Sequence, residues 1–304
     1  MRLIYEGVDI SGDVDIHRCT HRDVSGGRCD SMDLILEHLD AWYAWQPARD
    51  DAIEIEHEGY TTGKLFLNTI LPENGRYRII ATSLPSTAMQ RKWQSFRDMR
   101  LGDIMRNCAA QSGMEWALYG LDENIRYPYI ERKNESCPSF LNRLMQMEGG
   151  TLKCVAGRMA GIGIKYAQDL DAGQAIELRA EQDALQYRRR EDTKYGGITV
   201  LTPYAQASAQ DDTAAGRAHI TCDLPATNAI QAARWARGML LANNRQAERL
   251  KCCMELNIGM TAMARIDITG GTDADGKWIV DEAEHDFINE KTTVQLLRCI
   301  DTIQ

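Results

Sequence analysis

The chain has 304 residues and a formal net charge of −9, with charged residues making up 26% and aromatic residues 7%. This length can bury a sizeable core and suggests about two domains, and the negative charge argues against a nucleic-acid-binding surface. No run of 18 apolar residues is present and residues 1–6 turn acidic at once, so neither a membrane span nor a signal peptide is expected. We expect the chain to fold in the cytoplasm, with no membrane partner and with its nine cysteines reduced.

Residues 1–86 are predicted to form a first β-barrel, completed by strands from about 167–185. Residues 53–57 alternate apolar and polar side chains, which is the period of a half-buried strand. Asn74 and Gly75 tolerate the positive φ angles of a type I′ turn and therefore predict a hairpin. The other stretches with strand composition are 30–36, 65–67 and 77–81.

Residues 87–166 are predicted to form an α/β middle domain. Apolar residues from Leu101 to Ala109 follow helical spacing, and Gly113 suits the left-handed end of that helix. A second helix is expected after Ser136, a residue type favoured at the N-cap, with Pro138 in the first turn. Strands are predicted at 152–155 and 162–166.

Residues 186–304 are predicted to form a second β-barrel that carries a helix at about 228–246. The apolar stripe of this helix is assigned to Ala229, Ala233, Ala236 and Leu240. The small and polar stretch 205–216 is predicted to be a surface loop. Further strands are expected at 174–178, 198–201, 262–268, 278–287 and 294–300. The predicted fold class is α+β, mainly β, with two tandem small barrels and an α/β domain between them.

Several short segments have an order and spacing that together resemble the late control protein D family of phages. They are 59–63, 81–85, 96–113, 134–144, 148–150, 228–241, 278–287 and 294–297. The same segments are similar to the hub part of type VI spike proteins and to the T4-type phage hub. The resemblance covers most of the chain and depends on the order of the segments more than on any one of them.

This resemblance implies a structural baseplate hub of a contractile injection particle: a phage, a prophage or a phage-tail-like bacteriocin. It implies a homotrimer whose six tube-forming barrels make a pseudo-sixfold ring around a central channel. The ring would join the hexameric tail tube protein, or a tube initiator, to a separate trimeric spike protein. Baseplate wedge proteins are further partners, DNA passes only in transit, and the location is the virion or extracellular particle. The candidate ring or tube contacts are Gly59, Tyr60, Gly63, Trp278, His285 and Phe287.

A zinc-binding adaptor is an alternative interpretation. On a strand, His17, Cys19 and His21 would share one face, and Cys29 after the turn at Gly26 could supply a fourth ligand. The spacing matches no standard zinc module, and a half-exposed strand with a buried thiol is the favoured explanation.

Little in the sequence supports an enzymatic function, and neither a catalytic residue nor a cofactor is predicted. Glu54, Glu56 and Glu58 could form an acid/base cluster of a tail-associated cell-wall hydrolase, or a solvated or lumen-facing edge. Ser83 lies in no nucleophile elbow, and there is no phosphate loop or dinucleotide fingerprint. The arginines at 188–190 are either a solvated run or a grip for an acidic partner subunit or passing DNA.

Overall fold

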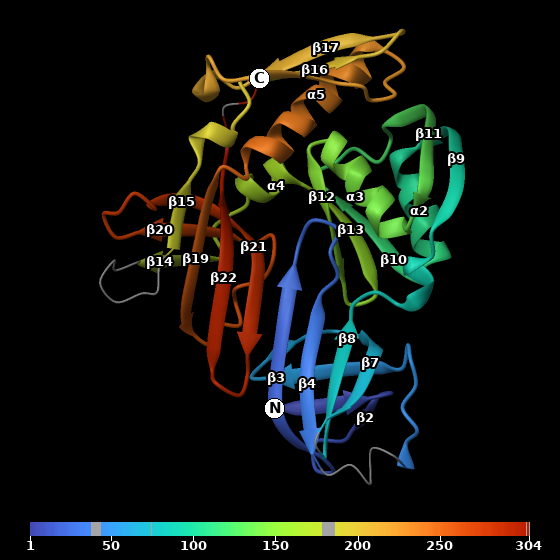
Figure 1. Ribbon diagram of the computed structural model, residues 1–304, viewed down its shortest axis with the longest axis vertical. Coiled ribbons are helices and arrows are strands. Elements are labelled where there is room, and N and C mark those ends of the chain that lie inside the picture. The colour runs from blue at the N-terminus through green and yellow to red at the C-terminus, as the bar shows by residue number, and fades with distance from the viewer. Residues whose placement is uncertain (38–43, 74, 178–185, 302, 304) are drawn as a thin grey trace.

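The computed structural model describes residues 1–37, 44–73, 75–177, 186–301 and 303. The fold is mainly β, as predicted, and it is elongated, with the N-terminal strands at one end and helix α5 toward the other (Figure 1). None of the helices in these ranges is both long and apolar enough to cross a bilayer.

The N-terminal β region is a curled antiparallel sheet with strand order β3-β4-β8-β7-β5-β1-β2, and β6 pairs with β5. Its core contains Leu3, Leu34, Ile55 and Ile79, which are fully buried. The predicted hairpin is present, because Glu73 pairs with Arg76 across the turn; Asn74 lies outside the described residues. The strands are β1 Arg2–Tyr5, β2 Val8–Asp9, β3 Asp15–Val24, β4 Ser31–Glu37, β5 Ala52–His57, β6 Tyr60–Thr61, β7 Leu65–Glu73 and β8 Arg76–Thr82.

The C-terminal β region has strand order β15-β19-β22-β21, and β20 pairs with β21. Leu250, Trp278 and Val280 are buried in its core. Strand β14 pairs in parallel with β20, so residues 174–177 complete this region and not the first barrel as predicted, while 178–185 lie outside the described residues. The strands are β14 Gln174–Glu177, β15 Gln186–Arg189, β19 Glu248–Glu255, β20 Arg265–Thr269, β21 Gly276–Asp286 and β22 Lys291–Arg298.

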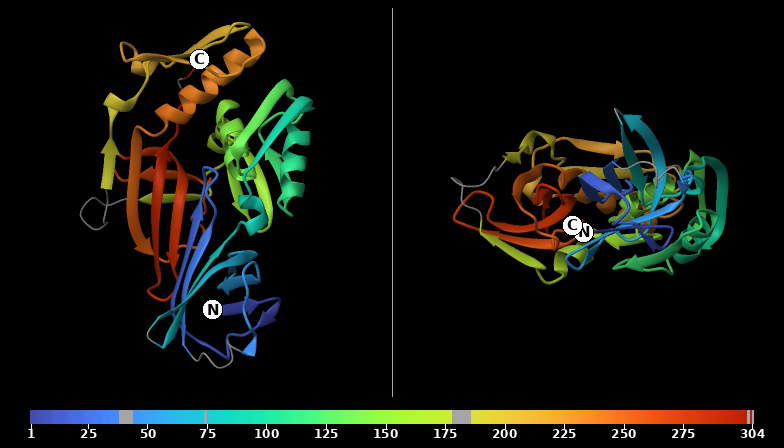
Figure 2. Two further views of the ribbon diagram at one scale, coloured as in Figure 1. Left: turned by 45° about the vertical axis from the view of Figure 1, so that its right-hand side comes forward. Right: turned by 90° about the horizontal axis from the view of Figure 1, so that it is seen from below.

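A middle region packs against both β regions, as the two views of Figure 2 show. Its two predicted helices are present: Ser136 caps α3 by accepting from the Ser139 backbone N at 3.3 Å, and Gly113 follows α2 with φ +66°. Phe96 stacks on Phe140 in the core that these helices share. The elements are η1 Ser86–Met89, β9 Lys92–Arg100, α2 Leu101–Gln111, β10 Glu115–Tyr119, β11 Arg126–Glu135, α3 Cys137–Met147, β12 Gly150–Val155, β13 Arg158–Gly163 and α4 Ile164–Asp169.

Two local predictions were wrong. The strand predicted at 162–166 ends at Gly163, and Ile164 begins helix α4, because Ile164 and Ala167 bury side chains at helical spacing. The predicted loop 205–216 contains a strand, β17 Gln206–Gln210, which pairs with β16 Gly197–Leu201 and buries Ala209. The other elements of this part are η2 Glu191–Thr193, η3 Asp212–Ala214, β18 His219–Cys222 and α5 Ala229–Asn244.

Helix α5 packs on α3 and on the β16–β17 strands, so its buried face belongs to the core of the middle region. The prediction had placed this helix with the second barrel. The buried stripe consists of Ala232, Trp235, Ala236 and Leu240, whereas the predicted Ala229 is exposed. The stripe is shifted because Trp235, the largest side chain of the helix, is fully buried and donates to Glu148 Oε1 at 2.7 Å.

Gly238 lets α5 approach the end of α3, since a Cβ at this position would lie 2.2 Å from the Met147 carbonyl oxygen. Gly238→Ala should therefore lower the free energy of unfolding by about 2 kcal/mol, although alanine is the better helix former. Denaturant unfolding measures the loss. Gly12→Ala, whose added methyl meets no atom within 4 Å, is the control, and equal stability of the two variants would contradict the close crossing.

Candidate functional site: the seam between the two β regions

The two β regions form one continuous sheet because β21 pairs antiparallel with β3. Glu282 lies opposite Val24 and Asp286 opposite Thr20, and Figure 1 shows β19, β22, β21, β3, β4 and β8 side by side. Residues directly opposite in a sheet share a face, so the pairings define a surface that crosses both regions. We call it the shared polar face; its two cross-strand rows are Glu255, Lys291, Asp286, Thr20 and Asp33, and Cys253, Thr293, Glu284, Arg22 and Ser31.

Ion pairs connect neighbouring strands on and around the shared polar face. Arg22 lies 2.8 Å from Glu284 across the seam, and Arg78 lies 2.8 Å from Asp33 between β8 and β4. At one edge, Arg28 Nη1 donates to Glu282 Oε2 at 2.7 Å. Opposite charges placed directly across a sheet stabilise the pairing of its strands.

The other side of the seam is a buried cluster of rings. Tyr60 OH lies 2.7 Å from His21 Nδ1, and its ring makes an edge contact with His285, 5.2 Å between centroids. Phe287 packs against the same tyrosine at 5.7 Å. His285 Nε2 donates to the Met260 carbonyl at 3.1 Å, which makes its Nδ1 the acceptor from the Thr292 hydroxyl at 3.0 Å.

Burial keeps both histidines neutral. It lowers the pKa of His21 to about 3 and also lowers the pKa of His285, while the nearby carboxylate of Asp23 opposes both shifts. The neutral imidazole of His285 donates one hydrogen bond and accepts another, whereas His21 is bonded through Nδ1 and its buried Nε2 has no partner among the described residues. The cluster therefore acts as packing between the two β regions and not as an acid/base pair at neutral pH.

A buried lysine of the middle region ties the three regions together. The Lys153 ammonium on β12 contacts Asp23 Oδ1 on β3 and lies 3.8 Å from Asp30 Oδ2. The second oxygen of Asp23 accepts from the backbone N of Ala262 in the C-terminal β region at 2.9 Å. Ser83 adds a further link by donating to the Cys154 carbonyl at 2.6 Å.

Asp30, one of the two carboxyl groups that face Lys153, is fully buried and is protonated more easily than an ordinary aspartate. Burial raises its pKa to about 7, although the Lys153 charge and a hydrogen bond from the Val24 backbone N act in the opposite direction. The site can therefore hold one carboxylate and one lysine as an ion pair in the interior. Breaking such a pair costs more than its net contribution to folding, because a lone charge would be left buried.

The structure separates the four residues of the predicted zinc set. A bulge at His17 breaks the strand alternation, and this side chain points to solvent and pairs with Glu37 at 2.8 Å. Cys19 lies in the core of the N-terminal β region, and His21 lies in the ring cluster. Cys29 is a free cysteine whose backbone forms an isolated β-bridge with the backbone of Cys154. Within the described parts of the chain, no group of three or more His, Cys, Asp or Glu could hold a metal ion.

Most side chains proposed as ring or tube contacts are not on the surface. Trp278 and His285 are fully buried and Phe287 is 5% exposed, so these three side chains hold the chain's own core. Gly63 has φ +63° and packs on Ala156, where a Cβ would come within 2.6 Å. Of the six candidates, Gly59 is exposed, in the turn between β5 and β6.

The predicted glutamate cluster stays on an outer surface. Glu56 pairs with Arg2, Glu54 accepts from the Thr61 hydroxyl, and Glu58 lies exposed in the turn with φ +49°. Of the two interpretations of these glutamates, an acid/base cluster or a solvated or lumen-facing edge, this arrangement fits the edge. Glu56 and Glu58 both line a cavity at this strand end, and Arg2, which also lines it, is the ion-pair partner of Glu56.

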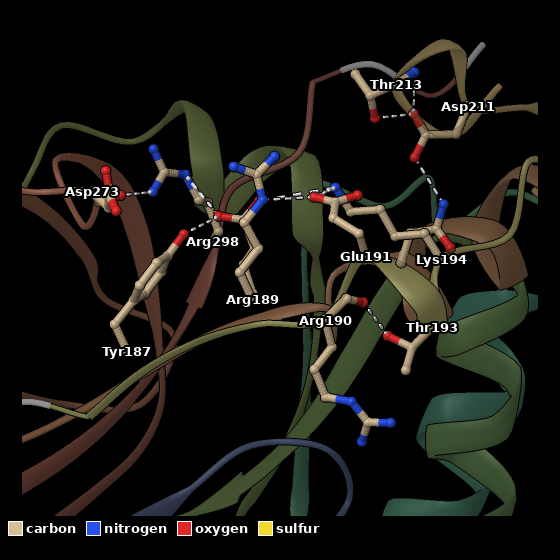
Figure 3. A network of polar contacts seen from close by, with 12 residues as sticks. Tyr187, Arg189, Arg190, Glu191, Thr193, Lys194, Asp211, Thr213, Asp273 and Arg298 are labelled. Carbon is tan, nitrogen blue, oxygen red and sulfur yellow. Dashed lines mark hydrogen bonds and ion pairs between the residues drawn. The ribbon is translucent and has the colours of Figure 1, made fainter.

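The arginine run at 188–190 is divided by strand alternation. Arg189 faces a polar network around Glu248, where its Nε also donates to Glu191 at 2.7 Å and the Tyr187 hydroxyl donates to Glu248 at 3.2 Å (Figure 3). In the same network Arg298 lies 3.5 Å from Glu248 and donates to the Asp273 carbonyl (Figure 3). Arg188 lies on the opposite, outer face of β15, opposite Arg249.

The buried ion pair at the seam was not predicted from the sequence. Its one signal was Lys153 itself, a lysine between Leu152 and Cys154 in a strand that the middle domain buries on both faces. Asp23 and Asp30 gave no such signal, because carboxylates next to strands are common and their partner lies far along the chain.

Comparison with known proteins shows that the chain is similar to proteins of phage tails. The chain is 24% identical over 212 residues, 65% of its length, to a probable baseplate hub protein of Escherichia phage P2. The match covers 54% of that relative, so the chain spans about half of its length. No family model matches the chain.

Solved structures agree on the fold. A tail protein from Neisseria meningitidis MC58 superposes with a TM-score of 0.77 at 11% identity, over 98% of this chain and 95% of that one. A component of the E. coli type VI secretion system, described as structurally similar to T4 bacteriophage tail proteins, gives 0.63 at 11% identity over 99% of this chain and 78% of that one. The chain thus has the fold of phage tail proteins, and its predicted resemblance to baseplate hub proteins is confirmed.

Removing the buried cation should be costly. Lys153→Met leaves Asp23 and Asp30 without a positive partner and should lower the free energy of unfolding by about 3 kcal/mol or more in denaturant titrations. Lys92→Met, on an exposed lysine, is the matched control and should change stability by less than about 0.5 kcal/mol. Adding Asp23→Asn to Lys153→Met should recover part of the loss; a purely additive double variant would contradict the pairing.

The buried groups at the seam should make the free energy of unfolding depend on pH, and the histidines and Asp30 should act in opposite directions. A lowered histidine pKa gives stability that is complete above about pH 6.5 and is lost as pH falls, whereas a raised Asp30 pKa gives stability that is lost as pH rises toward about 7. Asp30→Asn keeps the acceptor for Val24 and removes the second effect. Its unfolding free energy should fall more steeply than that of the wild type between pH 6 and 5, by about 1.4 kcal/mol per pH unit. Equal slopes in urea unfolding would show that Asp30 does not titrate in this way.

Proposed function

We propose that this chain is the structural baseplate hub of a contractile injection particle, with no catalytic role. Three copies form a pseudo-sixfold ring that joins the tail tube to a separate trimeric spike and surrounds a central channel. The observation that carries the proposal is the shared polar face, a single charged surface that crosses both β regions of a chain with the tail-protein fold. The likeness to a probable baseplate hub protein supports the same assignment.

The shared polar face is the surface that we assign to the channel wall. Apart from Cys253, its two rows consist of charged and hydroxyl side chains, and the largest apolar side chains of the same strands face the two cores. A wall of this kind stays hydrated and presents no apolar surface to which a passing polymer could bind. Its carboxylates and the net charge of −9 also repel DNA, which keeps contacts weak if the particle carries a genome.

The seam supplies the stiffness that a symmetry adaptor requires. Two β regions linked by a loop alone would change their angle, whereas here a strand pairing, a buried ion pair and a ring cluster fix it. A fixed angle within each copy allows three copies to close a ring without strain. We assign the chain to the baseplate of the particle, with the baseplate wedge proteins on the outside of the ring.

Native mass spectrometry tests the assembly directly. The purified chain, alone or mixed with the spike protein of the same particle, should give a species of three 34.2 kDa chains, or of three chains with three spike chains. A monomer in both samples would contradict the proposed ring. Release of sugar fragments from purified cell wall would instead support the hydrolase alternative.

A further inference from the structure

The outer edge of the C-terminal β region carries three exposed cations: Arg188 on β15, and Arg249 and Lys251 on β19. Across the ranges that the structure describes, none of the three forms an ion pair with a carboxylate; Arg249 donates to Gln246 instead. They share one face, because Arg188 lies opposite Arg249 and Lys251 follows two positions along the strand. We call these three residues the basic cluster.

The arrangement costs stability within a single copy. Like charges directly opposite in an antiparallel pair repel one another, and the three cations line a groove of about 180 Å³. The one carboxylate that lines this groove is Asp281, which already pairs with Arg28 at 3.2 Å. Elsewhere on the same face, arginines such as Arg22 and Arg78 have carboxylate partners. Within the described residues, the cluster is therefore a positive surface without a carboxylate partner of its own.

The opposite end of the molecule has the complementary charge. Residues 1–86 contain 15 Asp and Glu against eight Lys and Arg. On the outer surface of β1, β2 and β5, Asp9 and Glu54 both lie opposite Ile4, and Glu56 lies opposite Arg2, the one cation of this group. The side chains of Asp9 and Glu56 are 41% and 40% exposed, and the two carboxylates share a single cation, Arg2, at 2.9 and 2.5 Å. We call Asp9, Glu54 and Glu56 the acidic face.

We propose that the basic cluster of one copy docks on the acidic face of the N-terminal β region of a second copy. Strand β15 is the last strand at one end of the sheet, and the acidic face belongs to the strands at the other end. A contact between two different ends is heterologous, and it closes a ring of three copies when each copy is rotated by a third of a turn from the last. The inference rests on the proposed function for the existence of the ring, and it adds which surfaces form the contact between copies.

Charge reversal and charge exchange test the contact. Arg188→Glu with Arg249→Glu should weaken association of copies at least about tenfold in analytical ultracentrifugation, and so should Glu54→Lys with Glu56→Lys. All four substitutions in one chain should restore association at least about tenfold relative to either pair. Wild-type association should weaken as salt rises from about 0.05 to about 0.5 M. Arg91→Glu with Lys92→Glu, an equal charge change on the middle region, is the control, and circular dichroism verifies folding of every variant.

The remaining outcomes distinguish a failure of the proposed contact from a failure of the proposed ring. If the wild type assembles and the reversal at 188 and 249 leaves association unchanged, the ring stands and the contact lies elsewhere. Failure of the exchanged chain to recover would also overturn the pairing of these two surfaces. If the reversal abolishes only binding of a fluorescent single-stranded oligonucleotide, the cluster is a nucleic-acid contact. A wild type that never associates overturns both the ring and the contact.

Discussion

The pairing of β3 with β21 is the constraint on which the rest of the structure depends. It joins segments from opposite ends of the chain and places Thr20 to Val24 against Glu282 to Asp286 in one register. Because side chains alternate across a strand, a shift of one residue would turn the charged row inward and the histidines outward. The pairing therefore sets the shared polar face and the buried ring cluster together.

The middle region acts as a clamp on this pairing. Lys153 reaches from β12 to Asp23, whose other oxygen is bound by the backbone of the C-terminal β region. A buried ion pair adds little net stability, but it penalises every arrangement in which its partners are separated. Combined with neutral histidines, it makes the angle between the two β regions a fixed property of the chain. This rigidity is the physical property that a ring-forming adaptor needs.

Local signals allowed most elements to be predicted, and non-local contacts explain the failures. The alternation of 53–57, the stripe from Leu101 and the Ser136 cap each act over a few residues, and the structure has β5, α2 and α3 there. The exposure of Ala229 and the strand at 206–210 follow from packing between α5 and β16–β17, which no short window contains. Likewise, the histidines suggested zinc because alternation was assumed through His17, where a bulge interrupts it. The resemblance gave the fold class, but neither the β3–β21 register nor the partner of Lys153 could be predicted from it.

A cryo-electron microscopy reconstruction of the assembled baseplate tests the central claim most directly. The account predicts three copies of this chain around the particle axis, with Arg22, Glu284 and Thr293 of the shared polar face lining the channel. A reconstruction in which this face points away from the axis, or is covered by another protein, would contradict it.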